Sequence, residues 1–172
     1  RSTPSNSSAA SDVYKRQVPH LKRVNRGKMN LYNVAEKAID MGINKVVIID
    51  RWKGRPGRMR FFEVKDKLSS IPPLLYIRGV KFRRDFKVKG RLSPNVFIED
   101  SESTEIKRLS EMFSKFFELP KVKSKKIDDL HRFTVMRLTS DSDDMIRISF
   151  FQMPENVEVG PRVRISHVVW EI

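Results

Sequence analysis

The most constraining feature of this chain is a helical apolar stripe that leads directly into a β-branched apolar run. The stripe has the i, i+3, i+4, i+7, i+8 spacing of an amphipathic helix: Leu31, Val34, Ala35, Ala38 and Ile39. Asn30 is placed to cap the free amides of this helix, and Gly42 to end it in a left-handed conformation. The run 46–49 is apolar on both faces, which is typical of a buried parallel strand between layers of helix. Together these elements predict a βαβ organisation.

Most of the remaining chain has the pattern of short strands. We expect these strands at 21–25, 59–64, 74–77, 96–98, 133–138, 145–151 and 162–170. A second helix with an aromatic stripe begins after the serines at 101–103 and stops before Pro120. The pattern predicts an α/β or α+β fold, a sandwich of two similar lobes with a small mixed sheet and helices in each.

Two cation-rich segments receive specific structural predictions. The segment 53–58 contains two Gly and one Pro, so we expect a loop from which its cations project. The segment 80–89 alternates apolar residues with Lys and Arg, which predicts a strand with one basic face. Arg84 and Asp85 interrupt this alternation, so a bend in the strand is expected there.

The charge of the chain is unevenly distributed. The formal net charge is +14, from 35 Lys and Arg against 21 Asp and Glu. Residues 18–100 carry 20 basic and 8 acidic residues, a net of +12, whereas residues 101–172 carry 12 of each and are neutral. We therefore expect a basic lobe over about 18–93 and a balanced lobe over about 94–172. A polyanion is the natural partner of the basic lobe, and a merely solvated face is the alternative.

The first 17 residues differ in composition from the rest. Ser, Ala, Asn and Thr dominate residues 1–17, and no helical or strand period is present. Such a composition cannot bury a core, so we expect a disordered leader. The residues 11–17 resemble translated sequencing-adapter read-through, which indicates a non-native leader, and a natural disordered tail is the alternative.

Several function classes lack the residues they need. The chain has no Cys, which excludes disulfide scaffolds, zinc ribbons and thiolate nucleophiles. No apolar run approaches the roughly 18 residues of a membrane span, so we expect a soluble protein. Metal-ligand spacing and a P-loop are both missing, and the histidines are isolated. We expect His167 to be a core histidine beside Val163 and Ile165, and Asp141, Asp143 and Asp144 to form a hairpin turn. No enzyme activity, metal or cofactor is predicted.

Nucleic-acid binding requires only cations spaced to meet phosphates and a few planar groups, and the basic segment has both. Arg suits phosphate because its planar fork pairs with two oxygens at once. Trp52 and Tyr76 are available for base stacking, although either could be packed in the core instead. Nothing is similar to a helix-turn-helix, zinc finger or basic zipper, so structured RNA is favoured over duplex DNA. The candidate RNA-binding residues are Arg26, Lys28, Arg51, Trp52, Lys53, Arg55, Arg58, Arg78, Lys81, Arg83, Arg84, Lys87 and Lys89.

Five separated blocks of sequence resemble the Brix-domain family. The best match is to the archaeal single-domain members of this family, which are related to a protein of the eukaryotic small-subunit processome. The blocks are 24–28 (VNRGK), 47–58 (VIIDRWKGRPGR), 72–80 (PPLLYIRGV), 160–162 (GPR) and 167–170 (HVVW). The resemblance covers about residues 18–172, but the chain departs from the family at its start, where the first βα unit is replaced.

The resemblance implies a ribosome-biogenesis role without catalysis. It implies binding of pre-ribosomal RNA, assistance in small-subunit rRNA processing and assembly, and ribosome-assembly proteins as further partners. It also implies that each lobe is similar to the anticodon-binding domain of class II aminoacyl-tRNA synthetases. The implied location is the cytoplasm of an archaeon, or the nucleolus if the source is eukaryotic. Two other hypotheses compete: an adaptor whose basic face docks an acidic protein, and an RNA-processing enzyme.

Overall fold

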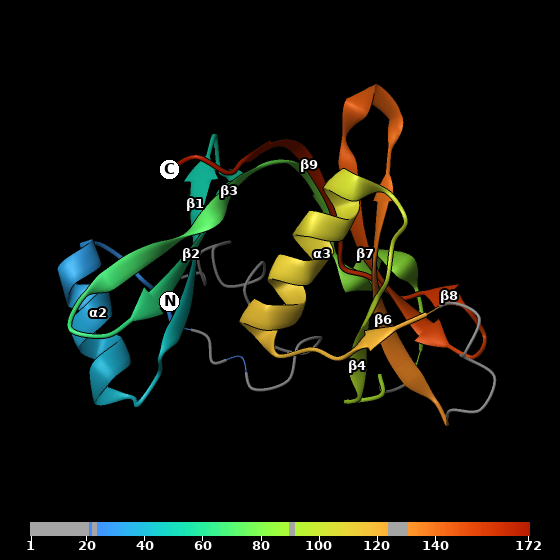
Figure 1. Cartoon of the computed structure of the whole chain (residues 1–172), viewed down its shortest axis with the longest axis horizontal. Coiled ribbons are helices and arrows are strands. Elements are labelled where there is room, and N and C mark those ends of the chain that lie inside the picture. Colours follow the sequence, from blue (N-terminus) through green and yellow to red (C-terminus); the bar gives the residue numbers. More distant parts are fainter. Residues whose placement is uncertain (1–20, 22–23, 90–91, 124–130) are drawn as a thin grey trace, which may run out of the picture. The chain divides into compact units, whose positions relative to one another are not determined.

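A computed structural model describes residues 21, 24–89, 92–123 and 131–172 of the chain (Figure 1). The predicted leader at 1–17 lies outside the described residues. The chain divides into two compact units. We call them the α2 unit, made of Val24–Arg78 and Ile165–Ile172, and the α3 unit, centred on Gly79–Arg164.

The helix of the α2 unit forms where the apolar stripe predicts it. Helix α2 spans Leu31–Asp40 and buries Ala35 and Ala38. The backbone N–H of Asn33 donates to the Asn30 side chain at 2.9 Å, and Gly42 has a φ of 65°, so both predicted ends of the helix are confirmed.

The sheet of the α2 unit is antiparallel where its register is defined. Strands β1 (Lys45–Trp52), β2 (Arg55–Val64), β3 (Leu68–Lys81) and β9 (Arg162–Val169) follow one another in that order. Strand β1 is the edge strand and pairs antiparallel with β2, so the prediction of a parallel strand at 46–49 is wrong. The reason is the turn at Lys53 and Gly54, with φ values of 49° and 76°, which sends the chain straight back beside β1.

Two other sequence predictions for this unit are also wrong. Only Lys53 and Gly54 form the predicted loop, because β2 already begins at Arg55. The cations at Arg55 and Arg58 therefore lie on a strand. Leu21, Val24 and Asn25, the described residues of the strand predicted at 21–25, lie in no strand.

The α3 unit packs one long helix on a mixed sheet. Its elements are β4 (Val96–Glu99), α3 (Thr104–Phe117), β5 (Lys121–Val122), β6 (Phe133–Ser140), β7 (Ile146–Met153) and β8 (Val157–Glu158). The sheet order is β9-β7-β6-β4-β5, with β4 parallel to β5 and β6, β7 antiparallel to β6, and β8 paired with β7. Helix α3 buries Ile106, Leu109 and Phe113. A 3-10 turn, η3 (Ser142–Asp144), connects β6 to β7, as predicted for the acidic hairpin turn.

The predicted basic strand at 80–89 does not exist as one strand. Strand β3 ends at Lys81, and a 3-10 turn, η1 (Arg83–Phe86), follows it. The backbone N–H of Phe82 donates to the Asp85 carboxylate at 2.8 Å, and Lys87 has a φ of 54°. Asp85 thus caps a turn, and this local bond outweighs the alternation of apolar and basic residues.

The boundaries of the two units differ from the lobe boundary near residue 93 that charge alone suggests. Residues 79–93 belong to the α3 unit, and the C-terminal residues 165–172 belong to the α2 unit. The end of β9 joins the α2 unit because it lies beside β3, where the Ser166 hydroxyl donates to the Tyr76 carbonyl at 3.4 Å. Over the described residues, the fold is a mixed α/β structure built from a sheet and two helices, which confirms the predicted class. In the described ranges no helix has the length and apolar character to cross a membrane.

Candidate nucleic-acid interface

Three arginines of the α2 unit converge on one carboxylate, Asp50 at the end of β1. Arg26 lies 3.0 Å from Asp50, Arg58 2.9 Å and Arg60 3.0 Å. Arg26 also donates from Nε to the Met29 carbonyl at 2.9 Å within the turn at 26–28, and its ion pair with Asp50 connects this turn to β1. One negative charge offsets one of the three positive charges, so the cluster keeps a surplus of +2.

The β1–β2 turn presents cations and an aromatic ring to solvent. Trp52 is 71% exposed, and Arg51, Lys53 and Arg55 are exposed around it. The turn lies at the end of the hairpin away from α2 (Figure 1). Gly57 makes room for Trp52, because a Cβ at position 57 would stand 2.5 Å from the Trp52 Cβ. Of the two readings left open for Trp52, the structure selects the exposed one.

The register places several of these side chains on one face of the sheet. Asp50 is opposite Arg58, and Arg58 is opposite Tyr76, so one row crosses β1, β2 and β3. Trp52, two residues after Asp50 on β1, continues the same face, because alternate residues of a strand share a side. The pairing with β2 shifts its register between Asp50 and Arg51, and Arg55 becomes the partner of Trp52. Tyr76 is 40% exposed and therefore also stays outside the core.

His167 lies on this exposed face and not in a core. Its side chain is exposed, and its ring contacts Tyr76 edge to face at a centroid distance of 6.1 Å. The prediction of a core histidine is therefore wrong. Alternation correctly places His167 on the same side of β9 as the buried Val163 and Ile165. It does not show that the core covers this side at Val163 and Ile165 but not at position 167.

The second group of predicted cations surrounds η1 in the α3 unit. Its members are Lys81, Arg83, Arg84, Lys87 and Lys89, of which Arg83 is half-buried and the others are exposed. Phe86 is the centre of this group: Lys81 Nζ lies 4.5 Å and the Arg162 guanidinium 5.4 Å from its ring centroid. The structure thus divides the predicted site residues between two units, with Arg26, Lys28, Arg51, Trp52, Lys53, Arg55, Arg58 and Arg78 in the α2 unit.

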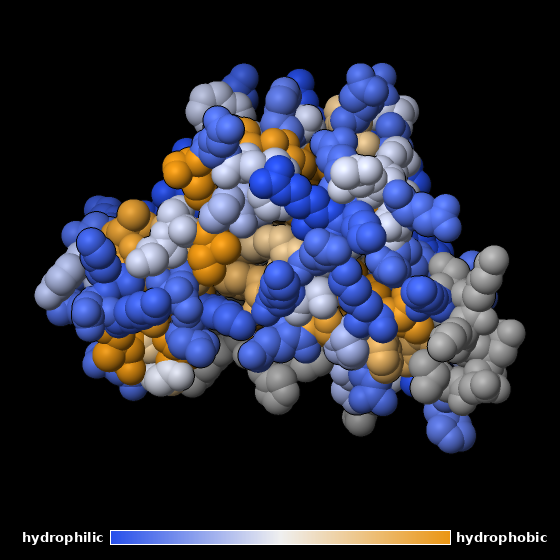
Figure 2. Space-filling view, viewed as in Figure 1, coloured by the Kyte–Doolittle hydropathy of each residue, from blue (hydrophilic) through white to orange (hydrophobic). Residues whose placement is uncertain are grey.

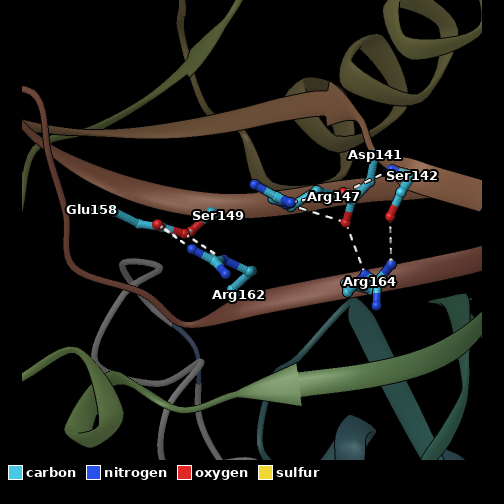
Figure 3. Close-up of polar contacts among 7 residues, drawn as sticks. All are labelled: Asp141, Ser142, Arg147, Ser149, Glu158, Arg162 and Arg164. Carbon is cyan, nitrogen blue, oxygen red and sulfur yellow. Dashed lines mark hydrogen bonds and ion pairs between the residues drawn. The ribbon is translucent and has the colours of Figure 1, made fainter.

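The arginines of the later strands are paired with acids of the same unit. Figure 3 shows Arg147 and Arg164 on the Asp141 carboxylate, at 2.7 and 2.8 Å, and Arg162 on Glu158. Arg137 pairs with Glu99 in the same way. These side chains account for most of the arginines of the balanced segment, and their charge is largely compensated where they stand.

Pairing with arginine lowers the pKa values of two of these acids, Asp141 and Glu158. The hydrogen bond from Arg147, followed by those from the Ser142 N–H and Arg164, lowers the pKa of Asp141 to about 2. Burial alone would raise the pKa of Glu158, but hydrogen bonds from Arg162 and Ser149 lower it overall. Both groups are therefore carboxylates at neutral pH.

The described residues show no arrangement typical of a metal centre. Within 24–89, 92–123 and 131–172, no three His, Asp or Glu side chains come together as a potential metal site. His131 is exposed, two residues before β6 begins. The face drawn in Figure 2 is mostly hydrophilic, with smaller hydrophobic patches.

Sequence reasoning missed two features of this surface. The sequence did not predict that Asp50, Arg58 and Arg60 meet, although Arg60 stands two residues after Arg58 on the strand opposite Asp50. A hairpin register for 45–64 would have brought all three together. The Tyr76–His167 contact was also missed, because it joins residues far apart in the sequence on β3 and β9.

Solved structures establish the class of fold. A crystal structure of a probable ribosomal biogenesis protein from Aeropyrum pernix has a TM-score of 0.71 and 17% identity, covering 96% of this chain and 91% of that one. A crystal structure of an archaeal Imp4-like protein has a TM-score of 0.61 and 14% identity, covering 96% and 89%. The chain therefore has the fold of these archaeal proteins.

Sequence comparison with curated proteins identifies homologues of this chain. The chain is homologous to archaeal proteins described as probable Brix domain-containing ribosomal biogenesis proteins, which confirms the resemblance stated from the sequence. That of Pyrococcus horikoshii is 33% identical over 75 residues, 44% of this chain and 34% of the relative. That of Sulfurisphaera tokodaii is 30% identical over 91 residues, 53% and 51% respectively. The chain thus spans about a third to a half of the length of these relatives. No family model matches the chain.

Proposed function

We propose that this chain acts in ribosome biogenesis by binding pre-ribosomal RNA, and that it assists small-subunit rRNA processing and assembly without catalysing a reaction. The observation that carries this proposal is the contrast between its two sets of arginines. Those of the later strands are compensated by Asp141, Glu158 and Glu99, whereas the exposed cations of 26–89 greatly outnumber the acids near them. The homology to ribosomal biogenesis proteins supports pre-ribosomal RNA as the target of this basic surface.

The chemistry of the proposed contact is electrostatic with an aromatic addition. Exposed arginines such as Arg51 and Arg55 form paired hydrogen bonds to phosphate oxygens. Trp52 offers a ring face to a base, and stacking of this kind tolerates any base. The cations around η1 extend the binding capacity to the α3 unit: Lys81, Arg83, Arg84, Lys87 and Lys89.

The remaining parts of the proposal concern partners, organisation and location. Ribosome-assembly proteins are further partners, and the charge-balanced segment is free to meet them. Two lobes, each similar to the anticodon-binding domain of class II aminoacyl-tRNA synthetases, would present the basic residues. The proposed location is the archaeal cytoplasm, where ribosomes assemble.

A salt titration tests the proposal. Affinity of the chain for small-subunit rRNA fragments is measured across a salt series, with tRNA and duplex DNA as competitors. The expected result is selective binding that weakens steeply with salt, because neutralised phosphates release counterions. The double variant Arg51→Glu, Arg55→Glu should lose affinity, whereas Lys107→Glu, Lys123→Glu, with the same charge change at exposed positions of the balanced segment, should not.

Two results would contradict the proposal. Affinity independent of salt would remove its electrostatic basis. Tight binding to an acidic assembly protein with none to rRNA would support the adaptor hypothesis instead.

A further inference from the structure

The exposed face of the α2 sheet carries planar side chains on three of its four strands. Trp52 lies on β1, Tyr76 on β3 and His167 on β9. We infer that this face is a stacking platform for unpaired nucleotides, so that the chain selects single-stranded loops or bulges of RNA over continuous duplex. The inference rests on the proposed RNA-binding function and names the class of RNA that this face takes.

The shared face follows from the pairing register. The row Asp50, Arg58 and Tyr76 runs straight across β1, β2 and β3. Trp52 stands two residues after Asp50 on the same strand, on the same side. The T-shaped contact between Tyr76 and His167 brings β9 to the same surface. Neighbouring strands are spaced by about 4.8 Å, so β1 and β3, which flank β2, lie about 10 Å apart.

The exposure of these rings lacks a folding reason. Trp52 is 71% exposed and Tyr76 40%, although burying a large aromatic side chain would stabilise the fold by about 1.5–3 kcal/mol. Tyr76 is flanked on its own strand by Leu75 and Ile77, which are buried at 0% and 8% exposure. The strand therefore packs through its other face and leaves Tyr76 available to a ligand.

Cations surround the rings, which fits a polyanion and not an apolar partner. Arg55 and Arg58 lie on β2 between Trp52 and Tyr76, and Arg78 follows Tyr76 on the same face of β3. Asp50 is the acid of this row, and it holds Arg58 at 2.9 Å with Arg26 and Arg60 also bound. Arg26, Arg58 and Arg60 are thus fixed in place before any ligand arrives, which lowers the entropy lost on binding.

Unpaired RNA fits such a surface better than duplex RNA. In an A-form duplex the base faces are stacked on each other, so aromatic side chains on a sheet cannot reach them. In loops and bulges the bases can be splayed out over aromatic rings while the phosphates meet the nearby arginines. A broad sheet face with rings among cations therefore predicts a preference for unpaired nucleotides.

The test compares an unpaired 12-nucleotide RNA with a fully paired RNA duplex of the same phosphate number. Binding to the whole chain is measured at one salt concentration. Tyr76→Leu and Trp52→Leu should each weaken binding of the unpaired RNA by about 5-fold to 150-fold, with little change for the duplex. Tyr76→Phe should retain affinity, because the ring remains. Tyr32→Leu is the matched control, since Tyr32 is a 68% exposed tyrosine of the same unit on α2.

A second readout follows Trp52 directly. In a Trp170→Phe background, fluorescence of Trp52 should be quenched by the unpaired RNA and not by the duplex. Variants are compared only after their thermal midpoints show that they fold. Equal losses for both RNAs, or no loss in Tyr76→Leu and Trp52→Leu, would overturn the inference.

Further outcomes separate the inference from the proposed function. If the unaltered chain binds neither RNA, the proposed function fails and the inference fails with it. If both RNAs bind equally and Arg51→Glu, Arg55→Glu weakens both, RNA binding stands and the stacking platform is refuted. A polyglutamate peptide that displaces the unpaired RNA as effectively as a second RNA would also refute it, because the rings would then play no part.

Discussion

At the scale of single residues, Asp50 joins three arginines of the basic segment. Three cations that would otherwise repel one another share its carboxylate: Arg26, Arg58 and Arg60. Because the Asp50 side chain is only 20% exposed, its charge is weakly screened by water. The same carboxylate fixes the turn at 26–28 and positions the arginines proposed to meet phosphates.

Replacement of Asp50 tests this organising role. Asp50→Asn should lower the free energy of unfolding by about 1–3 kcal/mol, because hydrogen bonds to charged groups are lost among neighbouring arginines. RNA affinity at low salt should not fall in proportion, because the change adds one positive charge. Urea unfolding and RNA titration measure the two effects, with the exposed Asp66→Asn as control. Equal stability of the two variants would show that the arginines do not depend on Asp50.

The contribution of Asp141 to the stability of the fold depends on pH, and the lowered pKa of its carboxyl gives the sign of that dependence. Its pKa falls from 3.8 to about 2 in the folded chain, chiefly through the hydrogen bond from Arg147. A carboxyl whose pKa is lowered by folding stabilises the fold above its unfolded pKa, and that stabilisation is lost as the pH falls through the interval from 3.8 toward 2. The gap in stability between the unaltered chain and Asp141→Asn should therefore be constant above about pH 5 and shrink below pH 4.

Thermal midpoints measured between pH 3 and pH 7 check this expectation. Asp143→Asn, which changes an exposed carboxyl of the same turn, is the control. A gap that stays the same at every pH would mean that the pairing of Asp141 with Arg147 and Arg164 adds no pH-dependent stability.

At the scale of elements, short turns decide which side chains the strands present. The turn at Lys53 and Gly54 makes a hairpin of two predicted strands and brings Trp52 opposite Arg55. The η1 turn ends β3 at Lys81 and seats the Phe86 ring against Gly160. In both places the turn, and not the alternation of residue types, determines where the cations point.

The close approach of the Phe86 ring to Gly160 gives a prediction with a matched control. A Cβ at Gly160 would overlap the Phe86 ring, and the φ of Gly160 is 64°. Gly42 has nearly the same φ, 65°, but no atom within 4 Å of its ideal Cβ. Gly42→Ala should therefore show only the backbone cost of about 1–2 kcal/mol. Gly160→Ala should lose about 1–3 kcal/mol more, because the ring of Phe86 must move.

Chemical denaturation of the two glycine variants measures this difference. Displacement of Phe86 should also perturb the cations over its ring, Lys81 and Arg162. If both variants lose the same stability, Phe86 is not held against Gly160.

At the scale of the whole molecule, the distribution of charge is the property on which the proposed RNA binding depends. The net of +12 in residues 18–100 is spread over both units, because β3 carries the chain from one to the other. Each unit therefore presents its own group of exposed cations, while the later arginines are compensated. RNA binding would use both groups.

Removal of each group should reduce the salt dependence of binding separately. Log affinity falls as log salt rises, and three Gln substitutions at Arg51, Lys53 and Arg55 should make this negative slope shallower by about 2 for unpaired RNA. Three at Lys81, Arg84 and Lys87 should have a similar effect, and the six together should show the sum. A slope that changes for one group only would assign RNA binding to a single unit.

The sequence by itself determined the local elements and the charge. The position of α2, its cap at Asn30 and its end at Gly42 follow from spacing and side-chain chemistry that act within a few residues. The same holds for most strands, for the acidic turn after β6 and for the basic character of residues 18–100. These features need no knowledge of distant parts of the chain.

Only the tertiary structure decided which side chains meet and which stay exposed. The antiparallel pairing of β1, the arginine cluster on Asp50 and the exposure of His167 all depend on strands that are far apart in the sequence. Alternation gives the side of a strand on which a residue lies, but burial depends on what covers that side. The proposed stacking face was therefore visible only once β1, β2, β3 and β9 were placed beside one another.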